Sequence, residues 1–282
     1  MHNNRRTVET KYDMLRAKKK YGQNFLKDDR ILTQIVDAAE IDEKTAVIEI
    51  GPGLGALTEK LCQQAGFVLA YEIDRDLIPH LEQRFGSCKH FLLRCEDFLK
   101  VNIQEEIDTY LKEYETIAVV ANLPYYITTP IIFKLLTSTS EISKYVLMMQ
   151  KEVADRICGK PNTKDYNALS VAIAYRATAK KVLSVPKTAF IPQPNVESAV
   201  VRLDIDAIQK YFPKDERLFF DLIRLCFTQR RKTLLNNLSL KYSKEQVLRM
   251  LTDLGLSPQI RSEALQIEDF IRISDYLTQQ AL

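Results

Sequence analysis

The run Asn122-Leu123-Pro124-Tyr125-Tyr126 places an amide, a backbone carbonyl and an aromatic ring within five residues. The side-chain oxygen of Asn122 and the carbonyl of Leu123 are two acceptors, and Pro124 restricts the backbone that carries the second one. Together they can accept both hydrogens of an exocyclic amine, which takes its lone pair out of ring conjugation and aims it at an electrophile. Tyr125 offers a flat surface for stacking. The run therefore predicts a site that acts on the amino group of a planar base.

A second run, Glu49-Ile50-Gly51-Pro52-Gly53-Leu54-Gly55, combines an acid with three glycines. It follows a predicted strand and opens a predicted helix, where glycines let the backbone come close to a nucleotide ligand. The third glycine follows the second by two residues rather than three, which differs from the dinucleotide-binding pattern. The acid also disfavours a phosphate nearby. We expect a cofactor that has a nucleoside and a positive charge but no phosphates.

Two further acids end the next predicted strands. Glu72 lies about 20 residues beyond Gly51, where a carboxylate can accept both hydroxyls of a ribose, and Asp97 follows the third strand. The carboxyl edge of an open α/β sheet is its ligand-binding edge, so these side chains are expected to meet there. The ordinary alternative for each acid taken singly is a helix cap or a solvated strand end.

Short apolar runs alternate with stretches of helical spacing through residue 205, which predicts a parallel sheet covered on both faces. Beyond Asp206 only helical spacing remains, which predicts a smaller helical domain over residues 207–282 after a first domain over 1–206. The expected strands are 45–50, 67–72, 90–94, 116–121, 144–150, 181–185 and 199–205. The expected helices are 28–40, 57–64, 76–85, 103–113, 130–136, 168–176, 217–227, 233–238, 244–254 and 267–277.

The composition is that of a globular protein, with 46% hydrophobic and 27% charged residues, and it excludes collagen-like, disordered and membrane-spanning classes. The N-terminus has no apolar signal core, and its acids argue against a transit peptide, so we expect it to belong to a mature, cytoplasmic protein. The cysteines form no Cys-x-x-Cys pair and have no cluster of histidines near them, which predicts buried reduced thiols and no metal site. These cysteines are Cys62, Cys88, Cys95, Cys158 and Cys226.

Charge is distributed in a basic, acidic, basic order. Residues 1–27 carry a net charge of +6, residues 40–120 carry −8, and residues 151–202 and 208–240 carry +5 and +4. Such local surpluses of base suit nucleic-acid phosphates, although a solvated surface explains them equally well when charge is considered alone. The cluster Arg230-Arg231-Lys232 is the candidate for RNA contact in the helical region.

Four motifs in order resemble those of the rRNA adenine dimethyltransferase family, in its bacterial KsgA (RsmA) type. They are Tyr21 to Leu26, Glu49 to Gly55, Asn122 to Tyr125, and the late loop Phe190 to Ser198. The resemblance covers Tyr21 to about Leu203, and the helical tail is consistent with it. One position departs from the pattern, because Tyr126 stands where many members carry Asn. The resemblance implies a Rossmann-like class I methyltransferase sheet, mostly parallel with an antiparallel last strand, and a small helical C-terminal domain that docks on RNA.

The resemblance also implies roles for individual residues. The cofactor is S-adenosylmethionine, and the catalytic set is the Asn122 to Tyr125 motif, including Leu123 and Pro124, with Phe190 facing the target base. The implied substrate is a pair of adjacent adenosines in the hairpin near the 3′ end of small-subunit rRNA, each methylated twice on its 6-amino group. We further expect a monomer that acts on the small ribosomal subunit and contributes to its biogenesis. The implied cofactor contacts are Asn24, Leu26, Gly51, Glu72, Asp97 and Asn122.

Several alternatives compete with this interpretation. An antibiotic-resistance methyltransferase of large-subunit rRNA and a DNA adenine methyltransferase can both use an Asn-x-Pro-aromatic motif, but the Phe190 loop favours the KsgA type and no additional DNA-reading segment is present. A non-catalytic ribosome-assembly factor is a second class, and the intact Asn122, Pro124 and Tyr125 disfavour it. A phosphate-binding dehydrogenase is a third, and the glycine spacing disfavours it.

Overall fold

The computed structural model of the chain describes Lys18 and residues 22–138, 141–205 and 210–280. Most of the expected basic N-terminal segment lies outside these residues, as does Tyr21. Among the described residues, no helix is both long and apolar enough to cross a membrane.

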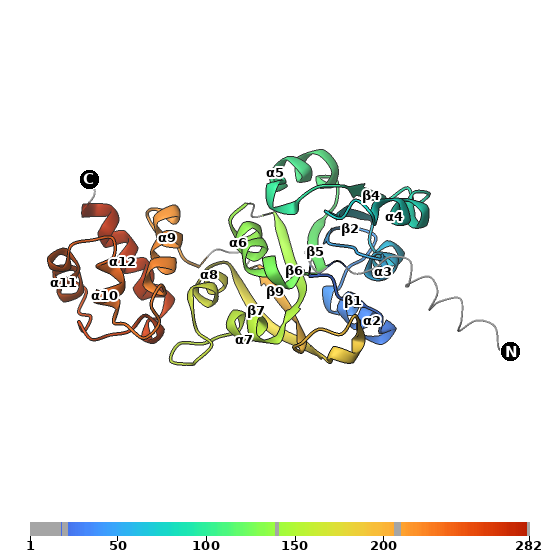
Figure 1. Ribbon diagram of the computed structural model, residues 1–282. Helices are drawn as coiled ribbons and strands as arrows, with labels where there is room; N and C mark the ends of the chain where they lie inside the picture. The colour runs from blue at the N-terminus through green and yellow to red at the C-terminus, as the bar shows by residue number, and fades with distance from the viewer. Residues whose placement is uncertain (1–17, 19–21, 139–140, 206–209, 281–282) are drawn as a thin grey trace. The chain divides into compact units, whose positions relative to one another are not determined.

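A seven-stranded sheet in the order β4-β3-β2-β5-β6-β9-β7 organises the first part of the chain (Figure 1). Strands β4, β3, β2, β5 and β6 are parallel to one another, and β9 runs antiparallel to β6. The prediction of a mostly parallel sheet with an antiparallel last strand is therefore confirmed. The strands are β2 (Thr45–Ile50), β3 (Phe67–Tyr71), β4 (Phe91–Arg94), β5 (Thr116–Asn122), β6 (Ile142–Gln150), β7 (Ala177–Val185) and β9 (Ser198–Ile205).

The central strands carry apolar side chains on both faces of the sheet, and helices cover these faces. Val47, Val120 and Met148 belong to one core cluster, together with the buried sides of α2 (Asp29–Ala39) and α3 (Ala56–Gln64). Asp28 begins α2 by accepting hydrogen bonds from two backbone N–H groups of its first turn. The helices that follow β3, β4 and β5 along the chain are α4 (Ile78–Phe85), α5 (Ile103–Glu106), which continues as a π-helical turn over Ile107–Leu111, and α6 (Thr128–Ser138).

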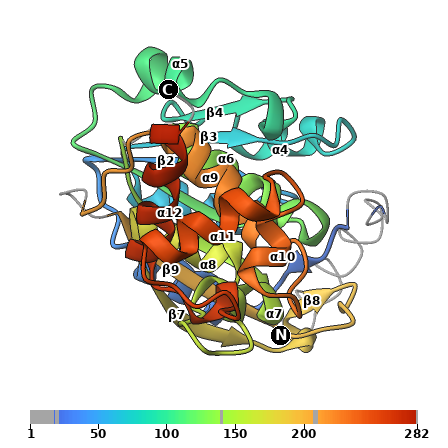
Figure 2. The same cartoon turned by 90° about the vertical axis from the view of Figure 1, so that its left-hand side faces the viewer.

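The remaining helices form a second compact unit. Helix α9 packs against α8, α10 and α12, and α10 packs against α11, so these elements form one bundle (Figure 2). Burial of Phe219, Ile223 and Phe270 supplies its core. The bounds are α8 (Ala168–Arg176), α9 (Glu216–Cys226), α10 (Leu234–Leu238), α11 (Lys244–Asp253) and α12 (Ile267–Gln280).

The two compact units differ from the expected domains in one respect. The first contains the chain up to Ala154 and Lys180–Asp204, and the second contains Asp155–Ala179 and Ile205–Leu282. The change near residue 205 matches the composition shift, but the segment 155–179 groups with the C-terminal helices. Tyr166 shows why, because its hydroxyl donates to the carbonyl of Leu265 at 3.0 Å. That these units are the catalytic and RNA-docking domains stays a prediction.

Three short elements were not anticipated from the sequence. Strands β1 (Phe25–Leu26) and β8 (Phe190–Ile191) form a separate antiparallel pair, and α7 (Lys151–Ile157) follows β6. Two-residue strands are too short to show periodicity, and only their long-range pairing defines them. The pair is functionally relevant because it joins the first expected motif to the late loop.

The loop between β2 and α3 depends on glycine. Gly51, Gly53 and Gly55 have φ values of +70°, +59° and +79°, a region that other residues enter only with strain. A Cβ at Gly55 would also lie 2.5 Å from the Phe85 ring, whereas a Cβ at Gly51 would meet only Pro124, at 3.9 Å. Backbone conformation therefore constrains Gly51 and Gly55 alike, but of these two positions only Gly55 is also constrained by packing.

We expect Gly55→Ala to destabilise the protein more than Gly51→Ala. Both variants incur about 1–2 kcal/mol from the left-handed conformation, and Gly55→Ala adds about 1–3 kcal/mol from overpacking against Phe85. Denaturant unfolding of the cofactor-free proteins measures the difference, with Gly51→Ala as the matched control from the same loop. Equal unfolding free energies for the two variants would contradict the packing argument.

Candidate active site

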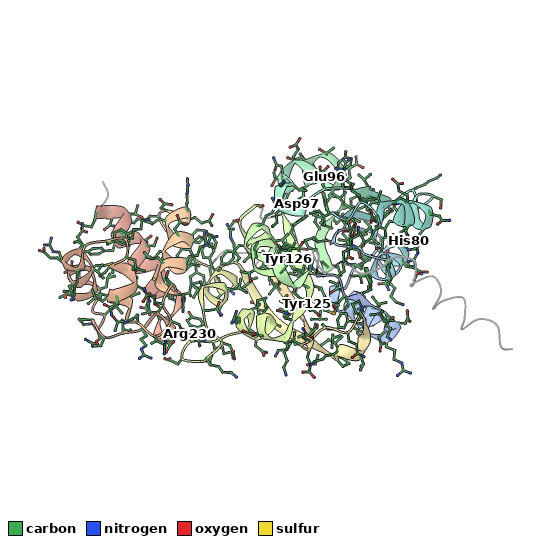
Figure 3. All side chains as sticks on the ribbon, in the orientation of Figure 1. His80, Glu96, Asp97, Tyr125, Tyr126 and Arg230 are labelled. Carbon is green, nitrogen blue, oxygen red and sulfur yellow. The ribbon has the colours of Figure 1, made fainter. Side chains whose placement is uncertain are left out.

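One cavity opens at the carboxyl edge of the sheet, where β2, β3, β4 and β5 end. The segment before β1, the glycine loop, and the turns after β3, β4 and β5 all contribute to its wall. Figure 3 labels Glu96, Asp97, Tyr125 and Tyr126 from two of these turns. Of the residues predicted from the sequence, the structure brings Asn24, Leu26, Gly51, Glu72, Asp97, Asn122, Leu123, Pro124 and Tyr125 together in this wall.

Glu72 is 4% exposed and is held by backbone donors. Its two carboxyl oxygens accept from the N–H of Gly53 at 3.1 Å and from the N–H of Asp74 at 2.8 Å. Burial raises the pKa of Glu72, and these donors oppose that shift. Each carboxyl oxygen has two acceptor sites, so the group can also accept from a pair of hydroxyls at the cavity surface.

Glu49 is a buried carboxyl group with one oxygen that a bound ligand could contact. It is 1% exposed, lines the cavity, and its Oε2 has no hydrogen-bond partner among the described residues. Burial raises the pKa of Glu49 to about 8, and the nearby Glu72 adds to the effect. A cation in the cavity would favour the ionised form of Glu49 and supply the missing interaction. The donor set therefore suits a positively charged nucleoside and opposes a phosphate.

Asp97 acts as a cap as well as a wall residue. Its side chain accepts from the N–H of Leu99 at 3.0 Å and begins the 3-10 turn over Phe98–Lys100. The cap was one of the two interpretations that the sequence left open for this residue. The capping hydrogen bond uses one acceptor site of the Asp97 carboxylate, and Asp97 still lines the cavity beside Phe98.

The amide of Asn122 has a defined orientation. Its Nδ2 donates to the backbone carbonyl of Asn24 at 3.3 Å, which leaves Oδ1 as the free acceptor. The next residue is fixed too, because the N–H of Leu123 donates to the carbonyl of Met148 on β6 at 3.0 Å. Thr128 donates to the carbonyl of Pro124 at 3.0 Å and holds the turn that follows. Asn122 and Leu123 are thus both fixed in the cavity wall, and their role in holding an exocyclic amine stays a prediction.

Comparison with known proteins agrees with this geometry. A family model described as ribosomal RNA adenine dimethylase matches residues 14–279. The chain belongs to this family. It is accordingly an S-adenosylmethionine-dependent rRNA adenine dimethyltransferase, and Glu49 and the acidic cavity fit a cofactor that carries sulfonium and ammonium charges.

Similar proteins cover nearly the whole chain. A Bacillus cytotoxicus protein named ribosomal RNA small subunit methyltransferase A is 47% identical over 265 residues, which is 92% of this chain and 91% of that protein. The crystal structure of a dimethyladenosine transferase from Plasmodium falciparum superposes with a TM-score of 0.75 at 26% identity, covering 92% of this chain and 98% of that one. That of the 23S rRNA methyltransferase ErmE has a TM-score of 0.64 at 26% identity, covering 91% and 100%.

Phe190 departs from the expected arrangement in this dimethylase. Its side chain is 1% exposed within the core cluster, it does not line the cavity, and in β8 it pairs with Leu26 of β1. An aromatic residue that leads an exposed loop can stack on a base, but strand pairing turns this ring inward. Partly exposed aromatic rings that line the cavity are those of Phe25, Tyr125 and Tyr126, of which Tyr126 is 52% exposed.

Ser198 is a site residue to which sequence reasoning gave no role. It is fully buried at the start of β9, and its hydroxyl lies 2.6 Å from the Tyr125 hydroxyl. Burial raises the pKa of Tyr125, so the phenol stays neutral and able to donate. The late loop therefore contacts the Asn122 to Tyr125 motif through its final serine rather than its leading phenylalanine. In the sequence, only the position of Ser198 at the end of the late loop could have pointed to this contact.

We expect Ser198→Ala to lower kcat for methyl transfer by about 2- to 10-fold, the equivalent of one hydrogen bond of about 0.5–1.5 kcal/mol. Tyr125→Phe removes the same bond from the other side, so the double variant should be no slower than the slower single variant. Cofactor affinity, measured by calorimetry, should be unchanged in all three. Additive losses in the double variant would show that this hydrogen bond does not position the ring.

Proposed function

We propose that the protein transfers methyl groups from S-adenosylmethionine to the 6-amino groups of two adjacent adenosines in the hairpin near the 3′ end of small-subunit rRNA. In this proposal it acts as a monomer on the small ribosomal subunit in the cytoplasm and contributes to the biogenesis of that subunit. The observation that carries the chemistry is the pair of fixed acceptors, Asn122 Oδ1 and the Leu123 carbonyl, beside the acidic cavity. The subunit and the nucleotides follow from the family resemblance and from the small-subunit name of the relative that is 47% identical.

Residues of the cavity wall divide into those that hold the cofactor and those that hold the base. The cofactor supplies an electrophilic methyl group. We assign the ribose hydroxyls to Glu72 and the cationic end to the neighbourhood of Glu49, whose buried oxygen lacks a partner. Asn24, Leu26, Gly51 and Asp97 complete the cofactor contacts.

The base is held by the Asn122 motif. Asn122 Oδ1 and the Leu123 carbonyl accept the two amine hydrogens, which directs the nitrogen lone pair toward the cavity. When the N–C bond forms, the sulfur–methyl bond of the cofactor would break and one N–H proton would pass to solvent, and the remaining hydrogen would keep one acceptor engaged for the second transfer. Tyr125 stacks on the ring, and the exposed Tyr126 offers a second surface at the mouth of the cavity. Because Phe190 is buried, its contribution is to pack β8 against β1.

Competing functions are less well supported. ErmE acts on 23S rRNA according to its name, but its identity to this chain is 26%, against 47% for the small-subunit relative. A purely structural assembly factor has no need of an Asn122 amide fixed by Asn24 or of an unsatisfied buried acid in an open cavity.

The central test is methyl transfer from radiolabelled S-adenosylmethionine to undermethylated small subunits, with large subunits as the control substrate. We expect label only in the small subunit, mapped to two adjacent adenosines. Asn122→Ala should lower turnover by about 100-fold or more because it removes one acceptor, while cofactor binding falls much less. Label in the large subunit would support the resistance-type alternative, and near-normal turnover by folded Asn122→Ala would refute the role of the amide.

The cluster Arg230-Arg231-Lys232 is the proposed RNA contact of the second unit. All three residues are exposed, but Arg230 already donates to the carbonyl of Lys164 and lies 3.9 Å from Glu263. Arg231 and Lys232 are therefore the better candidates for phosphate contacts, which position RNA without reading its sequence.

Replacing all three cluster residues with Ala should weaken small-subunit binding and reduce the slope of log affinity against log salt by about 2, close to 0.7–0.9 for each lost phosphate contact. The matched control removes the same charge from the acidic region by changing the exposed Lys44, Lys89 and Lys112 to Ala. Binding measured over a salt series tests the difference. If both triple variants retain the original slope, the cluster is a solvated surface and the RNA contact lies elsewhere.

A further inference from the structure

Cys62, Cys88 and His90 form a cluster that the methyltransferase site does not use. Their ligand atoms all lie within 4.8 Å of one another, and each residue is half-buried. Cys62 lies near the end of α3, and the other two precede β4. The sequence predicted scattered thiols and no metal site. In the fold, pairing of β3 with β4 brings residue 62 close to residues 88–90, so Cys62 and Cys88 are neighbours and not scattered.

The polar atoms of the cluster already face one another. His90 Nε2 lies 3.3 Å from Cys88 Sγ and 2.8 Å from the carbonyl oxygen of Cys62. The surroundings are apolar, since Cys62 packs against both core clusters of the first unit, as does Phe91, the residue after His90. Three side chains of ligand type therefore converge at a half-buried position on rigid elements.

We propose that Cys62, Cys88 and His90 form a zinc-binding site, with two thiolates, one imidazole nitrogen and a solvent-supplied fourth ligand. Sulfur and nitrogen ligands are those that zinc prefers, and two thiolates neutralise its charge, which suits an apolar environment. The partial exposure of all three residues leaves access for the ion and for the fourth ligand.

Zinc binding by thiols is coupled to proton release. A bound cation removes the proton from a coordinating thiol. Zinc uptake should consequently release protons and be weaker at lower pH.

The site has a structural role in this proposal. Cys62 lies in the last turn of α3, whereas the first turn of α3 follows the glycine loop of the cavity. His90 similarly precedes the amino end of β4, whereas Asp97 follows its carboxyl end. Zinc would therefore link α3 to β4 at the edge of the sheet opposite the cofactor cavity, and its binding does not depend on the proposed reaction.

The test uses the full chain, purified under reductant and stripped with a chelator. We expect one zinc ion per chain in a competition titration against a chromophoric chelator, and a thiolate charge-transfer band when cobalt(II) replaces zinc. Loss of a residue that only hydrogen-bonds to a zinc ligand costs roughly 10- to 100-fold in affinity, and Cys88→Ser and His90→Gln should each weaken zinc binding by more than this. The matched control, Cys158→Ser, removes another half-buried thiol and should bind zinc normally.

Thermal unfolding gives an independent readout, since zinc should raise the Tm of the unsubstituted chain and of Cys158→Ser but not that of Cys88→Ser. Absence of stoichiometric zinc, or its retention in both Cys88→Ser and His90→Gln, would overturn the proposal, as would a Cys62–Cys88 disulfide in protein kept under reductant. Methyl transfer by Cys88→Ser should remain normal, so failure of the zinc site and failure of the proposed function give different results.

Discussion

Two buried carboxyl groups at the ends of neighbouring parallel strands constrain the whole site. Glu49 and Glu72 are 1% and 4% exposed, and burial raises the pKa of both; Glu72 adds to the shift of Glu49, and Asp74 adds to that of Glu72. Two such acids are costly unless donors or a cation compensate them. The glycine loop supplies one donor, the N–H of Gly53, and it can do so only because its φ values are positive. Glu49 retains an oxygen without a partner, which a cationic cofactor can satisfy.

Burial of Glu49 also couples its ionisation to binding of a cationic cofactor. The pKa of the folded-state carboxyl is raised to about 8, above its usual value, so its neutral form predominates in the cofactor-free protein near pH 7. Folding stability is therefore lost as pH rises from the usual carboxyl range to about 8, because over this range the unfolded chain ionises the group while the folded protein keeps it protonated. A cation bound beside Glu49 lowers this pKa again. Cofactor binding and deprotonation of Glu49 should accordingly favour each other.

Sequence patterns predicted the helices and strands whose apolar residues repeat at a regular spacing. They missed the short strands that exist only because a distant segment pairs with them. The main strands and the helices α2 and α8 were predicted within a few residues because their apolar positions repeat. The pairing of β1 with β8 is long-range, and it alone decides that Phe190 faces the core rather than a base. The Ser198 contact and the cysteine cluster were missed for the same reason, since residue types were visible but the distances between them were not.

The segment from Gln23 to Leu26 connects these parts, because it is held at both ends. At one end Gln23 donates to Asp74 at 2.9 Å, and Asp74 also accepts from Lys18 at 2.6 Å, which anchors the segment to the loop that follows Glu72. At the other end Leu26 pairs with the late loop. Between the two anchors, the carbonyl of Asn24 fixes the amide of Asn122. A shift at either anchor therefore moves the acceptor that holds the amine, so the geometry of the reacting group depends on contacts made outside the Asn122 to Tyr125 motif.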